Sequence, residues 1–473
     1  MKQFVVFTPS ELDIDDIVTK NNVDLDIDYL RFLINYVLNG HANFIESFDE
    51  ESGERKRLRE HYVKIDSKKD VLVRDDKHKK HIEFLISNFK KYDRRLSRNT
   101  TEQRGLSALY RKGYEVGKRS YSYRVNPYYT KMKLTPHYLS DWRLINKIRR
   151  YSTKIPPIVM TGKYKFLLKY FQNQKLEIDF ISAIQHCNKR FESTKDYGKY
   201  LNEVYEIADI HNKVYRFYYT KETDSRLHTN LTMLPSDFRK YLTYDNKRLV
   251  EVDLSNSIIF FLNMLISNNV YLTSLESNNS LLMFCKSLET LSVKEIELFS
   301  DLALNGSFYD SFMGEIQEYY SMNDLKIIYN DQLGYDDEYF GNYKQVRRIA
   351  KKKILAMIFA STSAESYEFY RQIFSNKFPE LMKIINDFKN LKSSEDKRWY
   401  KKLSHILFQV ESEYLLNVVA RAFNKKFYRK APIFTLHDCL ITTEDFGGIL
   451  EEVIKDELIK EFGIAPDVKS KSW

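Results

Sequence analysis

The stretch IFTLHDCLITTE, residues 433–444, decides how the sheet of this protein is interpreted. Apolar and β-branched residues on both sides of His437 and Asp438 are typical of two buried strands. A buried carboxylate without a partner is costly, so the position of Asp438 needs an explanation. Two explanations remain open from these residues alone. Either His437 and Asp438 form the turn of a hairpin, where Asp is common, or Asp438 lies at the mouth of a sheet and binds a metal cation.

A second isolated carboxylate, Asp253, occurs in KRLVEVDLSNSIIFFLNMLI, residues 247–266. The pattern predicts a strand that runs into an apolar helix, with Asp253 where the strand stops. Taken alone, a helix N-cap or a turn is the simpler explanation of this residue. Two carboxylates at strand ends, however, are what a two-metal phosphoryl-transfer site requires. Hard oxygen ligands bind Mg²⁺ and leave coordination positions to water and phosphate.

The segment KQVRRIAKKKILAMIFAST, residues 344–362, predicts a helix without a single acidic residue. Arg347, Lys351, Leu355 and Phe359 are four residues apart and therefore lie along one stripe of that helix. The stripe begins cationic and ends apolar and aromatic, which suits the phosphates and the base of a nucleoside triphosphate. The cationic end is widened by further basic residues: Arg348, Lys352 and Lys353.

Composition bounds the class of protein. The chain has 473 residues, of which 43% are apolar, enough for a core in two or three domains. Its net charge of +10 is unevenly distributed. Residues 1–50 hold 3 Lys and Arg against 10 Asp and Glu, whereas residues 51–150 hold 28 against 12. A basic block with interleaved Tyr suits a nucleic acid, and a solvated basic surface is the open alternative.

Cysteine usage and hydropathy indicate where the protein works. Its three Cys are far apart, which fits a reducing compartment and predicts neither a disulfide framework nor a metal-ligand pair. No charge-free apolar stretch is long enough to cross a bilayer, and the N-terminal residues do not resemble a signal peptide. We expect a protein without membrane association, in the cytoplasm of a bacterial or phage-infected cell.

Several of these motifs together resemble a known family. RRIAKKKILAMIFAS (347–361) is similar to the fingers helix of family A DNA polymerases and of the related single-subunit, phage-type RNA polymerases. In that helix Arg and Lys lie four apart and an aromatic residue follows, as Arg347, Lys351 and Phe359 do here. VDLSNS resembles the first palm motif, whose Asp binds the catalytic metals, and LHDCL resembles the last palm motif, with its His-Asp turn.

Two further segments extend the resemblance to residues 220–473. SRLHTNLTMLP (225–235) resembles the segment before the palm, which implies that Arg226, with His228 beside it, reaches the primer–template. LFQVESEYL (407–415) occupies the place of a palm helix with a Gln near the primer terminus, which implies this role for Gln409. His437 is expected to approach the primer strand.

The sequence also departs from the family at three positions. Leu355 replaces the usual aromatic residue, Ala360 replaces a Gly, and Ile258 stands where DNA polymerases have Glu and the RNA polymerases have Gly. Ile258 and Leu254 are expected to lie next to the incoming nucleotide. These departures leave the sugar selectivity open, and a family-type exonuclease motif is not found.

The resemblance implies an α+β right-hand polymerase with a basic, mostly helical N-terminal region. It assigns residues 1–155 to that region, 156–219 to thumb-like helices, 220–291 and 403–473 to the palm, and 292–402 to the fingers. The implied reaction is template-directed nucleotidyl transfer, in which Asp253 and Asp438 hold two Mg²⁺ ions, or Mn²⁺, and Lys351 contacts the triphosphate. Expected partners are a primer–template, most simply DNA, and dNTPs, for a monomer that accessory replication proteins could assist.

Three alternatives stay open at this point. The first is a phage-type RNA polymerase or a primase-like enzyme. The second is an enzyme of the same fold that adds nucleotides without a template, for example in defence. The third is a nucleic-acid-binding protein without catalytic activity.

Overall fold

The computed structural model describes residues 4–42, 62–65, 77–87, 107–113, 121–267, 278–333, 340–392 and 395–473. Within these ranges the chain is an α+β protein with more residues in helices than in strands, which confirms the predicted class. The chain divides into two compact units. The first unit comprises residues 1–217, 229–248 and 473, and the second comprises 218–228 and 249–472.

The first unit alternates strands and helices along the chain. Its elements are β1 (Phe4–Pro9), α1 (Ile14–Asn21), α2 (Ile27–Ala42), β2 (Val63–Lys64), α3 (Lys77–Ile86), β3 (Leu109–Lys112), β4 (Ser122–Val125), η4 (Pro127–Tyr129), β5 (Leu134–Leu139), α4 (Trp142–Ser152), α5 (Pro157–Met160), α6 (Lys165–Gln172), β6 (Leu176–Ile178), α7 (Phe180–Thr194), α8 (Tyr197–Asn212), α9 (Asn230–Met233), α10 (Ser236–Arg239) and β9 (Leu242–Tyr244).

The core of the first unit forms around β1, all of whose residues are buried. This strand pairs antiparallel with β5, and α2 and α8 pack against it. Asn212, buried at the end of α8, accepts a hydrogen bond from the amide of Val5 at 2.7 Å and donates one to its carbonyl at 2.8 Å. The polar groups at this point of the buried strand are thereby satisfied.

Within the described part of residues 1–155, more residues lie in helices than in strands. The region also contains two sheets, because β2, β3 and β4 pair with one another in addition to the β1–β5 pair. These strands are short, and their pairing is completed by partners distant in the sequence. Much of the basic block at residues 51–150 lies outside the described residues.

The second unit contains a small sheet and a larger set of helices. Its elements are β10 (Lys247–Leu254) from Leu249 onward, α11 (Ser257–Ile266), α12 (Asn279–Leu288), α13 (Val293–Leu304), η5 (Asp310–Phe312), α14 (Met313–Tyr319), α15 (Met322–Leu333), α16 (Tyr343–Phe359), η6 (Glu365–Tyr367), α17 (Glu368–Lys377), α18 (Pro379–Asn390), η7 (Trp399–Lys401), α19 (Lys402–Ser412), the π-helix η8 (Glu413–Val419), α20 (Ala420–Lys426), β11 (Phe434–Leu436), β12 (Cys439–Thr443), η9 (Glu444–Phe446), α21 (Gly447–Phe462) and β13 (Val468–Ser472).

Strand β10 is the centre of the sheet in the second unit. It pairs antiparallel with β12 on one side and with β13 on the other, and β11 pairs with β12. The first two residues of β10 belong to the first unit, where they pair with β9, which in turn pairs with β6. Strands β7 (Phe217–Tyr219) and β8 (Leu227–Thr229) pair with each other.

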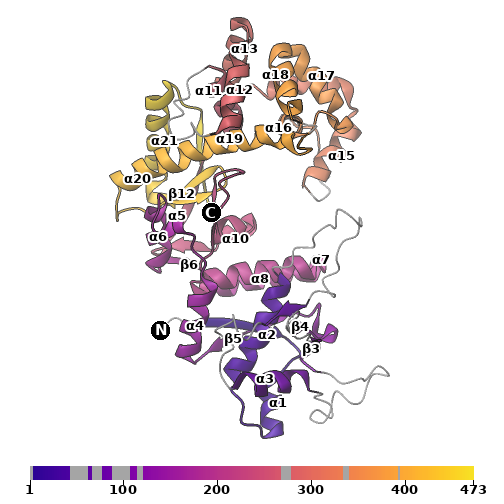
Figure 1. Cartoon of the computed structure of the whole chain (residues 1–473), viewed down its shortest axis with the longest axis vertical. Helices are drawn as coiled ribbons and strands as arrows, with labels where there is room; N and C mark the ends of the chain where they lie inside the picture. The colour runs from indigo at the N-terminus through magenta and orange to yellow at the C-terminus, as the bar shows by residue number, and fades with distance from the viewer. Residues whose placement is uncertain are drawn as a thin grey trace. The chain divides into compact units, whose positions relative to one another are not determined.

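The helices predicted from the polymerase-like motifs are confirmed as helices. Helix α11 follows β10 directly, and all ten of its residues are buried. Helix α16 begins at a capping box in which the side chains of Asn342 and Gln345 each accept a hydrogen bond from the other's amide. Its buried face packs on α15, α17 and α19, and α16, α17 and α18 lie together in Figure 1. Within the described residues, no helix has the length and apolar composition needed to cross a bilayer.

Candidate active site

The His437–Asp438 pair forms the turn of a two-residue hairpin. Leu436 of β11 pairs with Cys439 of β12, so only these two residues connect the strands. His437 has a φ of 52°, in the left-handed region that non-glycine residues seldom adopt. The predicted hairpin is confirmed, and the charge of Asp438 lies at the turn rather than inside a strand. His437 is exposed and Asp438 is partly buried.

The register of the sheet brings the two predicted carboxylates together. Asp253 of β10 pairs with Cys439 of β12, and Asp438 is the residue immediately before Cys439. Asp253 is exposed, and within the described residues neither carboxylate accepts a hydrogen bond. Desolvation by surrounding protein atoms and the negative charge of Asp438 raise the pKa of Asp253 to about 7. Glu411 adds to this rise, whereas Lys351 opposes it. The three predicted catalytic residues therefore share one electrostatic environment.

Glu411 is the residue of this site that the sequence interpretation missed. It lies on α19 with none of its side chain exposed, and it forms an ion pair with Arg226. Ser257, the first residue of α11, donates a hydrogen bond to it, yet burial and the charge of Asp438 hold its pKa above the usual range. An acidic residue within the apolar pattern of α19 was the available signal, but its partner, Arg226, is 185 residues away in the chain.

The two main cations of the predicted stripe on α16, Lys351 and Arg347, differ in whether other protein groups already bind them. Lys351 is exposed, and its side chain has neither an ion pair nor a hydrogen bond among the residues that the structure describes. Arg347 is already held, since its Nε donates to Asp310 at 2.8 Å and its second guanidinium nitrogen donates to the Gly306 carbonyl at 3.0 Å. Lys351 is thus the more available cation of the two.

The other residues of the stripe differ in exposure. Arg348 is exposed and lies over the ring of Tyr329, whereas Leu355 and Phe359 are partly buried. The ring of Phe359 packs against Phe408 with the ring centres 5.4 Å apart. The guanidinium of Arg226 also lies over the Phe408 ring, 4.7 Å from the ring centre. Phe408 therefore joins the end of the stripe to the Arg226–Glu411 pair.

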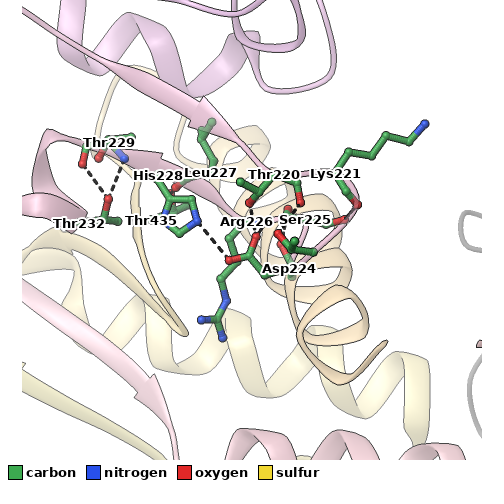
Figure 2. A network of polar contacts seen from close by, with 12 residues as sticks. Thr220, Lys221, Asp224, Ser225, Arg226, Leu227, His228, Thr229, Thr232 and Thr435 are labelled. Carbon is green, nitrogen blue, oxygen red and sulfur yellow. Dashed lines mark hydrogen bonds and ion pairs between the residues drawn. The ribbon is translucent and has the colours of Figure 1, made fainter. Parts of the chain in front are cut away.

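The loop of residues 220–228 is organised around Asp224 (Figure 2). Its carboxylate accepts hydrogen bonds from the hydroxyl of Thr220, from the amide of Arg226 at 3.0 Å and from His228 Nε2 at 3.1 Å. Burial opposes ionisation of Asp224, but the bonds from His228, Thr220 and the Arg226 amide are stronger and hold its pKa well below the usual range. His228 is consequently a structural partner of this loop in the described conformation.

The remaining predicted contact residues are also bonded within the protein or are buried. Gln409 is 7% exposed, accepts a hydrogen bond from Asn278 at 2.6 Å and donates one to the Lys221 carbonyl at 3.3 Å. Ile258 is 8% exposed and Leu254 only 2%. Of the expected nucleic-acid contacts, Arg226, His228 and Gln409 are engaged internally, and His437 is exposed.

The donor set at Asp253 and Asp438 fits a divalent cation. Within the described residues, no group of three or more His, Cys, Asp and Glu forms a closed metal site. Mg²⁺, however, is commonly bound by one or two carboxylates, with water and substrate phosphates completing the coordination. Among the described residues, neither of these neighbouring carboxylates has a hydrogen-bond partner, and desolvation followed by the charge of Asp438 raises the pKa of Asp253. This is an arrangement that a cation would neutralise.

Comparison of the chain with protein-family models gives no match. Comparison with curated proteins gives no significant match either.

Proposed function

We propose that the protein is a template-directed nucleotidyltransferase, a DNA polymerase that extends a primer with dNTPs. The observation that carries this proposal is the register of β10 and β12, which sets Asp253 beside Asp438. A right-hand arrangement, with residues 220–291 and 403–473 as the palm and residues 292–402 as the fingers, belongs to the same proposal. It is supported by the order of the polymerase-like motifs along the chain.

In the proposed reaction the primer 3′-oxygen forms a bond to the α-phosphorus of the nucleotide. The bond from that phosphorus to the pyrophosphate oxygen breaks, and the hydroxyl proton passes to water. Asp253 and Asp438 would hold the divalent cations, which, when bound, lower the pKa of the 3′-hydroxyl and neutralise the leaving pyrophosphate. Lys351, exposed and unpaired among the described residues, binds the triphosphate as a charged hydrogen-bond donor.

The remaining residues position the reactants. Phe359, fixed against Phe408, offers a flat surface to the incoming base. Arg347 contributes less to phosphate binding than Lys351, because Asp310 and the Gly306 carbonyl already hold its guanidinium. The buried Arg226–Glu411 pair fixes the loop of residues 220–228 against α19.

We also propose a preference for deoxynucleotides. Ile258 stands where the family places the residue closest to the sugar 2′ carbon, and a branched apolar side chain there offers no hydrogen bond to a 2′-hydroxyl. Phe359 likewise lacks the hydroxyl that Tyr provides in the RNA polymerases. A ribose hydroxyl buried without a partner costs about 1–3 kcal/mol.

Primer extension tests this function directly. The full chain is incubated with a labelled primer on DNA and on RNA templates, with dNTPs and NTPs in parallel and with a template-free arm. Extension that follows the template sequence and is faster with dNTPs supports the proposal. Faster extension with NTPs would favour the RNA polymerase alternative, and equal addition without a template would favour a template-independent enzyme. No addition in any arm would contradict all three.

A further inference from the structure

The exposed face of α4 in the first unit is basic along its whole length. The helix carries Arg143, Lys147, Arg149 and Arg150 and no acidic residue. Its opposite face is buried in the core of the unit through Leu144, Ile145 and Ile148. The buried face explains why the segment folds as an amphipathic helix, but it does not explain why four cations occupy the rest of it.

Aromatic rings flank the cations of this helix. At about 100° per residue, Arg143 and Arg150 fall near the middle of the exposed arc, with Lys147 beside them. Trp142 and Tyr151 fall on its two edges, and their exposed fractions are 55% and 41%. Exposed rings of this size at both edges of a cationic stripe combine the two features that proteins use to hold single strands, phosphate neutralisation and base stacking.

The protein itself does not neutralise these charges. Within the described residues, the side chains of Arg143, Lys147, Arg150 and Lys154 have no carboxylate partner, and Arg143 lies only over the ring of its neighbour, Trp142. The helix dipole favours cations in the last turn, which accounts for Arg149 and Arg150. It disfavours a cation in the first turn, where Arg143 lies, so the dipole does not account for the whole stripe.

The stripe leads into a hollow of about 790 Å³ at the end of α4, lined by Arg149, Arg150, Lys154, Met160 and Phe217 among others and by no acidic residue. Backbone hydrogen bonds fix its wall, since Lys154 donates to the Tyr215 carbonyl at 3.0 Å and Phe217 donates to the Lys154 carbonyl at 2.9 Å. These two bonds hold the backbone of Lys154 beside Phe217, so this part of the wall is fixed by main-chain contacts.

We propose that the basic face of α4 (Trp142, Arg143, Lys147, Arg150 and Tyr151), together with Lys154 just after the helix, binds single-stranded nucleic acid. The cations Arg143, Lys147, Arg150 and Lys154 contact successive phosphates, and the two rings stack on bases. The identity of the strand as unpaired template rests on the proposed function, whereas binding itself does not. An anionic membrane surface is disfavoured, because the apolar residues of α4 that would enter a bilayer are buried in the core.

Binding of a labelled 20-nucleotide oligothymidine to the full chain, measured by fluorescence anisotropy at several salt concentrations, tests the proposal. The Arg143→Ala/Arg150→Ala variant should bind about tenfold more weakly at ~0.1 M salt, with a salt slope smaller by about 1.4, since each lost phosphate contact on a single strand removes about 0.7. Trp142→Ala should weaken binding about fivefold or more. The matched control, Lys189→Ala/Lys199→Ala, removes two exposed lysines of the same unit and should change affinity less than twofold.

Three results would overturn the proposal: no binding by the wild type, unchanged affinity and slope in the double variant, or an equal loss in the control. Selective binding of the same face to anionic phosphatidylserine vesicles instead of oligothymidine would also overturn it. Primer extension by the wild type is measured in parallel. A wild type that extends primers but does not bind oligothymidine would defeat only this inference. A wild type that binds through this face but does not extend primers would defeat only the proposed function.

Discussion

Two carboxylates of the second unit, Asp224 and Asp253, lie in opposite environments. Asp224 in the loop of residues 220–228 is surrounded by donors, which hold its pKa well below the usual range even though burial opposes this. Asp253 at the end of β10 accepts no hydrogen bond among the described residues, and desolvation together with the charge of Asp438 raises its pKa to about 7. The protein supplies three hydrogen-bond donors to the carboxylate of Asp224 and, among the described residues, none to the carboxylate of Asp253.

The difference separates a structural role from a functional one. A carboxylate that accepts three hydrogen bonds from its own loop, as Asp224 does, holds that loop in place and has less capacity left for a ligand. Two negative groups held side by side without donors cost free energy in the empty site, a cost that a cation or substrate can offset. The same test divides the cations, since Arg226 is paired with buried Glu411 whereas Lys351 is unpaired among the described residues.

The largest expected effect on stability comes from Arg226, the cation that is paired with buried Glu411. Arg226→Ala leaves Glu411 buried without its partner, so the free energy of unfolding should fall by about 3–5 kcal/mol. Urea denaturation followed by circular dichroism measures it. The Arg226→Met/Glu411→Leu variant should recover much of the loss. If Arg226→Ala were as stable as the wild type but bound primer–template weakly, Arg226 would be a nucleic-acid contact instead.

Lys351→Ala tests the role of the cation that is unpaired among the described residues. Catalytic efficiency with the incoming nucleotide should fall about tenfold to hundredfold, because a charged donor to the triphosphate is lost. Primer–template affinity and the unfolding midpoint should stay near the wild-type values. Lys352→Ala, which removes the neighbouring exposed cation of α16, is the control. An unchanged rate at limiting nucleotide concentration would contradict the role of Lys351.

Asp224→Asn should weaken the loop without abolishing chemistry. The substitution removes the charge that three donors stabilise, so we expect a loss of about 1–3 kcal/mol in unfolding free energy. Nucleotide addition should persist at temperatures where the variant remains folded. Thermal unfolding and extension assays on the same preparation would separate the two effects. A folded Asp224→Asn variant without activity would place Asp224 in the chemistry.

Lys389 on α18 extends the comparison to a buried amine. It is 2% exposed and donates to the Met357 carbonyl at 3.1 Å, and burial lowers its pKa to about 7. Between pH 7 and the ordinary lysine value, the unfolded chain holds more protons than the folded one. Stability from this residue should therefore rise with pH, by at most about 1.4 kcal/mol per pH unit.

The unfolding free energy of the wild type minus that of Lys389→Met should accordingly increase between pH 7 and pH 9. Lys383→Met, an exposed lysine of the same helix, gives the reference pH dependence. A difference that stays constant or falls over this range would mean that Lys389 is charged in the folded protein.

Sequence reasoning found the elements whose signal is local. The hairpin at His437–Asp438, the strand-to-helix passage at Asp253 and the helix of Lys351 each carry their pattern within about twenty residues. It missed β13, because VKSKS at residues 468–472 is polar and becomes a strand only by pairing with β10. It also missed that Arg226 is committed to Glu411, because an ion pair between distant segments leaves no periodic trace.

The most direct test of the central claim is the rate of primer extension by Asp253→Asn and by Asp438→Asn, with Mg²⁺ and with Mn²⁺. The control is Asp456→Asn, an exposed carboxylate of α21 in the same unit. If the paired carboxylates hold the catalytic cations, both variants should lose at least about a thousandfold in rate, ~4 kcal/mol of transition-state stabilisation. Both should remain folded and bind primer–template, because removing one charge relieves repulsion, and the control should keep the wild-type rate. Near-normal extension by either variant would contradict the claim.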